Sequence, residues 1–412
     1  MTKLELFTII ASSVLILMSI VTSMINIFFR KVAYSGTLSD HQENIGEETI
    51  DGIDGTDDSD GQVSLPYPPI SVVLYAHDNA RDLERYLPAV LTQDYPASYE
   101  VIVVESKGED DTDDVLKKLK QEHDNLYTTF VPDSARYMSR PKLAITLGVK
   151  AAKHDWIVLT DPVFKPNSDQ WLKAMARNCT TGTDIIIGYS NFNDEASDYK
   201  RFERLLSQCY ILRDAQRNIA YRCDPGNLMF RKEMFIEGRS YDGNLKYIRG
   251  EYDFVVNKFA RKGNTATETS TEAWMIEDVP SRKHWVNSHL FYMETRKHLM
   301  RKVSHRLPFI VDQTALHLNF ILIIAALIVS AIQGLRQGFD LFSYLLAGCA
   351  CAALLITVTL RSFFASRKFK QFEAEIPSWK ILPFELSVLW RHLMYNIRYR
   401  MADKYDFISH KV

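Results

Sequence analysis

Three long stretches without Asp, Glu, Lys or Arg constrain this chain more than any other feature. They cover residues 6–29, 316–335 and 341–360. Because a helix rises about 1.5 Å per residue, roughly 20 apolar residues cross the hydrocarbon core of a bilayer. A signal peptide would have a shorter apolar core and a small-residue cleavage site, so the first stretch is expected to be an anchor. The alternative, that the two late stretches are buried helices of a soluble core, is disfavoured by their length and tandem order.

Basic residues flank these stretches unevenly and predict their orientation. Arg30 and Lys31 follow the first stretch, five basic residues lie at 296–306 before the second, and four at 361–370 follow the third. Only Arg336 lies between the second and third. Since cytoplasmic flanks carry the excess of Lys and Arg, we expect the N-terminus outside, the middle domain inside, the hairpin loop outside and the C-terminus inside.

The same features suggest five segments. Residues 40–62 are acidic and nearly lack large apolar side chains, which is typical of a flexible linker. The aromatic and basic C-terminal stretch is typical of a helix lying in the membrane interface. The predicted segments are an N-terminal transmembrane anchor (1–33), an acidic linker (34–66), a cytoplasmic domain (67–300), a two-span hairpin (301–362) and a basic, aromatic cytoplasmic tail (363–412).

Charge and cysteine content argue against nucleic-acid binding and against a fold held by disulfides or zinc. The net charge of -2 offers no overall attraction to nucleic acid, so no nucleic-acid partner is expected. The five cysteines form no CxxC pair and no zinc-binding spacing, which indicates reduced thiols rather than a disulfide framework.

The middle domain alternates apolar strands with amphipathic helical patterns. Predicted strands cover residues 70–75, 101–104, 156–160 and 185–188, and helical patterns separate the first three. Continuous apolar strands of this kind predict an α/β fold with a mainly parallel sheet and helices on both faces. Ligands of such sheets bind beyond the carboxyl ends of the strands, so the loops after Tyr75, Val104 and Thr160 are the expected site.

These loops carry an ordered series of short motifs between Pro69 and His298. The series contains Gln93-Asp94-Tyr95-Pro96, Leu159-Thr160-Asp161, Gly226-Asn227-Leu228 and Gly250-Glu251-Tyr252-Asp253. In this order they resemble a membrane-anchored family 2 glycosyltransferase with the GT-A fold. The resemblance implies a nucleotide-sugar donor, with uridine diphosphate as the expected nucleotide, a polysaccharide or lipid-linked acceptor, and Mg²⁺ or Mn²⁺ as cofactor.

The resemblance also assigns roles to individual residues. Glu251 or Asp253 would be the catalytic base, because a carboxylate near the acceptor hydroxyl can remove its proton. Asp161 and His298 would hold the cation that neutralises the departing diphosphate. The implied acceptor-side residues are Asn227 and Trp285, and the implied donor-binding residues are Asp78, Asn79, Glu105, Lys142 and Asp161.

Three positions depart from the family pattern. Ser106 stands where an aspartate usually follows the second strand, Val163 replaces the second aspartate of the Asp-x-Asp corner, and Tyr252 replaces the aspartate of the Glu-Asp pair. Two hypotheses therefore stand: an inverting, hexosyltransferase-type enzyme in which neighbouring groups substitute, or a catalytically silent scaffold of a glycan-assembly complex. A processive synthase fits less well, because the chain lacks a Gln-x-x-Arg-Trp motif. A bacterial inner membrane is the expected location.

Overall fold

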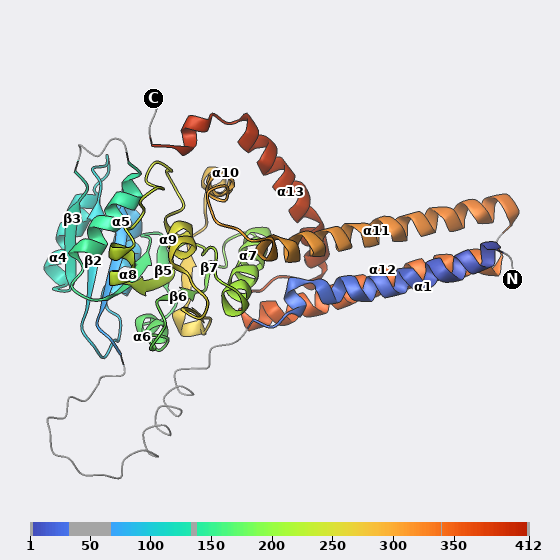
Figure 1. Cartoon of the computed structure of the whole chain (residues 1–412), viewed down its shortest axis with the longest axis horizontal. Coiled ribbons are helices and arrows are strands. Elements are labelled where there is room, and N and C mark those ends of the chain that lie inside the picture. Colours follow the sequence, from blue (N-terminus) through green and yellow to red (C-terminus); the bar gives the residue numbers. More distant parts are fainter. Residues whose placement is uncertain (1–2, 33–66, 133–137, 339, 410–412) are drawn as a thin grey trace, which may run out of the picture. The chain divides into compact units, whose positions relative to one another are not determined.

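A computed structural model of the protein describes residues 3–32, 67–132, 138–338 and 340–409 (Figure 1). The predicted acidic linker, residues 34–66, lies outside the described residues. The chain divides into two compact units, which are treated separately below. The first contains Met1–Lys31, Ser197–Tyr210 and Arg301–Met394, and the second contains Val32–Ala196, Ile211–Met300 and Tyr395–Val412.

A seven-stranded sheet forms the centre of the second unit. Its strand order is β3-β2-β1-β4-β8-β6-β9. The first four strands in this order are parallel, whereas β8 runs antiparallel to both β4 and β6. The mixed, mostly parallel sheet confirms the predicted fold class. The strands are β1 (Ile70–Ala76), β2 (Tyr99–Glu105), β3 (Leu126–Phe130), β4 (Trp156–Thr160), β6 (Ile185–Gly188), β8 (Leu228–Arg231) and β9 (Thr265–Glu268).

Helices cover both faces of this sheet, as the alternating strand residues require. Val72 of β1 belongs to the same apolar cluster as Leu83 and Leu87, whose spacing of four places them on one side of α3. The neighbouring Val73 points to the other face, where a Cβ on Gly148 of α5 would lie 2.6 Å from its Cγ1. The helices of this unit include α3 (Ala80–Leu91), α4 (Thr112–Glu122), α5 (Arg140–Ala151), α6 (Trp171–Ala176), α8 (Lys232–Glu237), α9 (Glu251–Phe259) and α10 (Arg282–Thr295).

A smaller sheet and a buried ion pair complete the second unit. The small sheet has the order β5-β10-β7, with β5 (Phe164–Pro166), β7 (Ser190–Phe192) and β10 (Met275–Glu277). Just after α6, the buried Arg177 makes two hydrogen bonds to the Glu268 carboxylate, at 2.7 and 2.6 Å. The side chain of Asn178 and the backbone N–H of Ser270 also donate to Glu268. This carboxylate therefore joins α6 to the end of β9.

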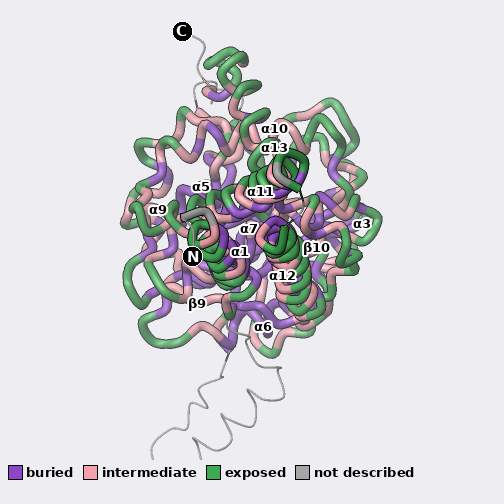
Figure 2. Tube along the Cα trace, turned by 90° about the vertical axis from the view of Figure 1, so that its right-hand side faces the viewer, coloured by how far each residue is buried: buried purple, intermediate pink, exposed green. Residues whose placement is uncertain are grey.

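Three helices of the first unit are long and apolar enough to cross a membrane, as predicted. They are α1 (Lys3–Ile25), α11 (Val303–Gln337) and α12 (Leu341–Gln371), and they lie side by side in Figure 1. In the most apolar 18-residue stretch of each helix, only 33, 22 and 28% of the residues, respectively, are buried within the protein. Many residues of these helices are exposed (green in Figure 2), and they include large apolar residues. Such faces are stable in contact with lipid. This unit also contains parts of α7 (Asp198–Arg217) and α13 (Ile381–Met401).

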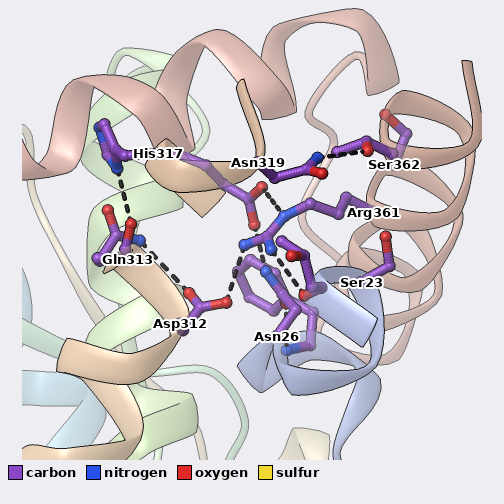
Figure 3. A network of polar contacts seen from close by, with 12 residues as sticks. Ser23, Asn26, Asp312, Gln313, His317, Asn319, Arg361 and Ser362 are labelled. Carbon is purple, nitrogen blue, oxygen red and sulfur yellow. Dashed lines mark hydrogen bonds and ion pairs between the residues drawn. The ribbon is translucent and has the colours of Figure 1, made fainter. Parts of the chain in front are cut away.

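One fully buried arginine connects four helices of this unit (Figure 3). Arg361 of α12 donates to Asp312 of α11 at 3.0 Å and to Glu385 of α13 at 2.7 Å. It also donates to the backbone carbonyl of Thr22 in α1, and Asn26 donates to Glu385 at 2.6 Å. The sequence places Arg361 among the basic residues flanking the third span. It lies inside the helix bundle because α12 continues ten residues past it, to Gln371.

Candidate functional site

Two predicted donor-binding residues, Asp78 and Asn79, lie in the loop after β1, and Asp78 connects this loop to the loop after β2. Asp78 Oδ1 accepts from the backbone N–H of Glu109 at 2.7 Å, and Asn79 Oδ1 accepts from that of His77 at 3.0 Å. Asp78 has a φ of 52°, a left-handed conformation that aspartate tolerates better than most residues. A Cβ on Gly108 would lie 2.1 Å from Asp78 Oδ1. Both side chains therefore fix the shape of the loops at this sheet edge.

Glu105 ends β2 and is the carboxylate nearest the first departure from the family pattern. Burial raises the pKa of Glu105, and the negative charges of Asp113 and Asp110 raise it further. The hydroxyl of the adjacent Ser106 forms a 2.9 Å hydrogen bond with that of Tyr75 at the end of β1. At this position, a hydroxyl pair stands where the family usually has an aspartate.

Asp161 directly follows β4, whose partner β1 is parallel to it. Burial raises the pKa of Asp161 to about 7, and the negative charge of Glu251 contributes to the increase. Val163 packs against the main apolar cluster. The corner therefore offers one carboxylate, and its third position is part of the hydrophobic core.

Glu251 is the first residue of α9 and interacts electrostatically with several elements of the sheet edge. Gly250, with a φ of 98°, provides the left-handed turn that starts the helix. Glu251 is 8% exposed, and its Oε1 has no hydrogen-bond partner among the described residues. The Arg249 guanidinium lies 3.7 Å from the same oxygen. The Glu251 charge acts on Asp161 after β4 and on Lys142 of α5, so the structure brings these predicted residues together.

Two buried tyrosines, which sequence reasoning did not select as site residues, complete this cluster. The Tyr241 hydroxyl has no hydrogen-bond partner among the described residues, whereas a hydrogen bond from Tyr252 to the Asp161 carboxylate lowers the pKa of Asp161. Burial raises the pKa of both phenols; Glu251 is the next cause for Tyr241, and Asp161 for Tyr252. Both phenols therefore remain protonated and can donate hydrogen bonds near two carboxylates. Tyr241 lies in an irregular segment with no strand or helix periodicity, so no sequence pattern identified it.

Asp253 has different partners from Glu251. Its Oδ1 lies 3.6 Å from Nε of Arg222, which also forms an ion pair with Asp224. Burial raises the pKa of Asp253 to about 6, although the Arg222 charge opposes the rise. Residues two apart on a helix point about 200° from each other. The two predicted bases therefore occupy separate environments, with Arg249 near Glu251 and Arg222 near Asp253.

Lys142 is fully buried, so it is not the helix-surface lysine that the sequence left open. Its Nζ donates to the backbone carbonyls of Tyr247, at 2.5 Å, and Arg249, at 2.8 Å. Burial lowers the pKa of Lys142 to about 8, while the Glu251 charge opposes the decrease. In this structure the ammonium group holds the segment that leads into α9.

The Asn227 side chain is buried and makes three hydrogen bonds within the fold. Its amide nitrogen donates to the carbonyls of Tyr189, at 2.9 Å, and Ala273, at 2.8 Å, while its oxygen accepts from the Trp171 indole at 3.1 Å. Asn227 is 1% exposed. Its amide therefore joins β8 to two neighbouring segments and the start of α6.

The two remaining predicted residues lie in or just after α10. The Trp285 indole donates to the Tyr395 hydroxyl at 3.1 Å. The His298 imidazole stacks on the Tyr247 ring at 3.9 Å, and its Nε2 lies 2.9 Å from Glu294 Oε1. His298 is thus next to the segment that Lys142 holds, and its ring contacts Tyr247 and Glu294.

The carboxylates can be tested for their fit to a divalent cation. Within the described ranges, no group of three or more His, Cys, Asp or Glu side chains is placed to hold a metal ion. Mg²⁺ is commonly bound by one or two carboxylates together with substrate phosphates. Asp161 and Glu251 Oε1, which accepts no hydrogen bond from the described residues and lies 3.7 Å from Arg249, fit binding of this kind. These two carboxylates could bind a cation that is also coordinated by a bound ligand, but they are too few to hold a cation by themselves.

Comparison with known families identifies which parts of this site lie in a region shared with other proteins. Residues 71–239 match the family model for glycosyl transferase family 2. The chain carries a family 2 glycosyltransferase domain. The family 2 match includes Asp78, Asn79, Glu105, Lys142 and Asp161 and ends before Glu251. The donor-side loops are therefore within the matched region, and α9 lies beyond it.

Curated and solved proteins show more distant similarity. Glycosyltransferase AglE of Haloferax volcanii is 26% identical over 165 residues, which cover 38% of this chain and 51% of AglE. The match thus spans about half the length of that relative. A mannosyltransferase from Pyrobaculum calidifontis, PcManGT, in complex with GDP-Man and Mn²⁺ is 16% identical, with a TM-score of 0.46, and the match covers 86% of this chain and 99% of that one. S. aureus TarS residues 1–349 in complex with UDP-GlcNAc is 12% identical, with a TM-score of 0.40, and the match covers 81% and 92%.

Proposed function

We propose that this protein is a membrane-bound glycosyltransferase that moves a sugar from a nucleotide-sugar donor to a lipid-linked or other glycan acceptor. The observation that carries the proposal is the electrostatic coupling of Asp161 and Glu251 at the carboxyl edge of a family 2 sheet. Both are partly or fully buried, yet Glu251 Oε1 has no hydrogen-bond partner among the described residues. Buried polar groups are normally satisfied, so an unpaired one beside a second carboxylate favours a ligand-binding role.

In the proposed reaction, each carboxylate has a separate task. Asp161 positions the donor, and Mg²⁺ or Mn²⁺ bound there would offset charge on the departing diphosphate. The acceptor hydroxyl oxygen bonds to the anomeric carbon as the bond to the diphosphate breaks, and Glu251 takes the hydroxyl proton. We favour Glu251 over Asp253 because the Glu251 charge acts on Asp161, whereas the charged neighbours of Asp253 include Arg222 and Asp224. Attack opposite the leaving group would invert the anomeric carbon.

The membrane location supports an acceptor near the bilayer. Three helices are apolar enough to span it, and α13 adds a stripe of exposed apolar side chains. That stripe includes Trp390, Leu393 and Ile397, with Arg391 and Arg398 on the same helix. Apolar and basic residues on one helix favour binding at the interface. We propose a bacterial inner membrane, a cytoplasmic catalytic domain and an N-terminus outside.

The second candidate, a silent scaffold in a glycan-assembly complex, is favoured by two particular residues. Val163 packs in the core where the family has a carboxylate, and Tyr252 occupies the family's position for the base. A scaffold of this kind would not bind a nucleoside diphosphate with a cation. Ligand binding therefore separates the two candidates.

The test uses the full chain in detergent with Mn²⁺ or Mg²⁺ and a panel of UDP- and GDP-sugars. We expect one donor to be hydrolysed or transferred, and Asp161→Ala to lose at least 100-fold in rate, since electrostatic groups contribute roughly 10²–10³-fold. Asp124→Ala, at an exposed aspartate, is the matched control and should keep full activity. A wild-type thermal shift with nucleotide and cation should disappear in Asp161→Ala. Equal activity or an equal shift in the two variants would reject the site.

A further inference from the structure

The segment leading into α9 is held from two directions within the second unit. One set of contacts comes from the start of α5, through Ser139 and Lys142. The Ser139 hydroxyl donates to the Ile248 carbonyl at 2.9 Å, and Lys142 binds the carbonyls of Tyr247 and Arg249. Residues 246–249, called here the pre-α9 loop, end one residue before Gly250 and two before Glu251. Movement of this loop would therefore move the candidate base.

The second set of contacts comes from the far end of the chain. Residues 404–409, called here the C-terminal strap, contain the short helix Lys404–Phe407 and an extended end. The Ile248 N–H donates to the Phe407 carbonyl at 3.0 Å, and the Ser409 N–H donates to the Lys246 carbonyl at 2.8 Å. Tyr247 and Ile408 form an antiparallel β-bridge. The strap thus pairs with the pre-α9 loop as a short strand would.

Side chains anchor the strap to α10 and α13. Phe407 is buried, and its ring lies 5.7 Å from that of Phe291 and 5.1 Å from that of Tyr399. Tyr399 in turn donates to Glu294, which also bonds His298. Because His298 stacks on Tyr247, these contacts return to the pre-α9 loop. The strap is therefore tied to the loop both by its backbone and through a chain of packed side chains.

We propose that the C-terminal strap is a positioning element of the candidate site: it holds the pre-α9 loop so that Lys142 can bind the loop carbonyls and Glu251 remains beside Asp161. The inference rests on the proposed function for its kinetic consequence and on contacts alone for its structural one. Short paired segments open locally at much lower free energy than a domain core, so loss of the strap would free the loop without unfolding the sheet. The strap acts through Glu251 and does not itself touch the reacting groups.

Two pairs of variants test the strap. Ser409→Pro removes the N–H that binds Lys246, whereas Ser409→Ala keeps it. Both variants lose the Ser409 hydroxyl, which donates to the same carbonyl at 3.2 Å, so they differ only in the backbone hydrogen bond. The preceding Ile408 is extended, with φ -123° and ψ 143°, and tolerates a following proline. Phe407→Ala removes the buried ring, whereas Tyr405→Ala removes a 46% exposed ring from the same turn. Each residue lies outside the proposed catalytic groups.

Hydrogen exchange provides the readout that does not depend on activity. In Ser409→Pro and Phe407→Ala, the Ile248 amide should exchange about tenfold faster, since a lost hydrogen bond or contact of this kind changes an opening equilibrium by about that factor. Amides of β1 and β4 should be unchanged, and both control variants should match the wild type. Unchanged exchange at Ile248 in Ser409→Pro would overturn the strap's structural role, whatever the protein's activity.

Kinetic measurements then distinguish a positioning role of the strap from an effect on stability alone. If the proposed function holds, both test variants should lower kcat at least tenfold and leave KM for the donor within about twofold, because the hydrogen bonds and ring contacts of the strap go to the pre-α9 loop, α10 and α13. Faster exchange with unchanged kcat would overturn the positioning role. Absence of turnover in the wild type would count against the proposed function alone, since the exchange result would still decide whether the strap holds the loop.

Discussion

The buried pair of Arg177 and Glu268 supports the most direct prediction of stability. Replacing Arg177 by methionine removes two of the four hydrogen bonds to Glu268 and its positive counter-charge. Asn178 and Ser270 remain as neutral donors to a carboxylate that is 0% exposed. Removing one partner of a buried ion pair typically destabilises a protein by about 3–5 kcal/mol. Because about 1 kcal/mol shifts Tm by roughly 2–4 °C in domains of a few hundred residues, we expect a decrease of about 6–20 °C.

Thermal unfolding of the full chain in detergent, followed by intrinsic tryptophan fluorescence, measures this decrease. The double variant Arg177→Met/Glu268→Gln should recover more than half of it, because no unpaired charge is left buried. Lys117→Met is the control: its pair with Asp113 is exposed to solvent, so the substitution should leave Tm unchanged. A decrease in Tm of less than about 3 °C in Arg177→Met, or no recovery in the double variant, would refute the argument.

Three further predictions concern the candidate site. Because burial raises the pKa of Asp161 to about 7, binding of nucleotide with cation should strengthen as pH rises from 6 to 8, and isothermal titration of Asp161→Asn should show no such trend. Gly250→Ala should lower kcat and Tm together, because alanine is strained at a φ of 98° and its Cβ would lie 2.6 Å from Thr295 Cγ2. Asn227→Ala should lower Tm by several degrees through its lost buried hydrogen bonds, while KM for the acceptor stays constant in the folded fraction.

Strands that are buried on both faces were predictable from the sequence, because they are continuous apolar runs. Trp156–Thr160 and Ile185–Gly188 are continuous apolar runs, and the structure has strands at the same residues. Leu228–Arg231 was recognised only as part of a family motif, since four residues without alternation do not distinguish a strand from a turn. Its antiparallel pairing with β4 and β6 depends on contacts far apart in the chain.

Side-chain roles were harder to predict than strands, because they depend on distant partners. Lys142 resembles an exposed helical lysine in sequence, yet its partners lie more than 100 residues later and bury it completely. Asn227 lies beside a glycine turn, which gives no sign that its amide binds two carbonyls and an indole. Local patterns report periodicity and turns, whereas burial of a polar group depends on tertiary pairing.

The buried ion pairs of Arg361 affect how the helix bundle assembles during synthesis. An unpaired arginine buried inside a helix bundle is strongly destabilising, and the two acidic partners of Arg361 come from different helices, Asp312 upstream and Glu385 downstream. During synthesis, Arg361 emerges from the ribosome before Glu385, so the inserting chain passes through a stage in which this charge has one partner at most. Chains that end before Glu385 would keep that incomplete pairing permanently, and membrane quality-control proteases would be expected to remove them.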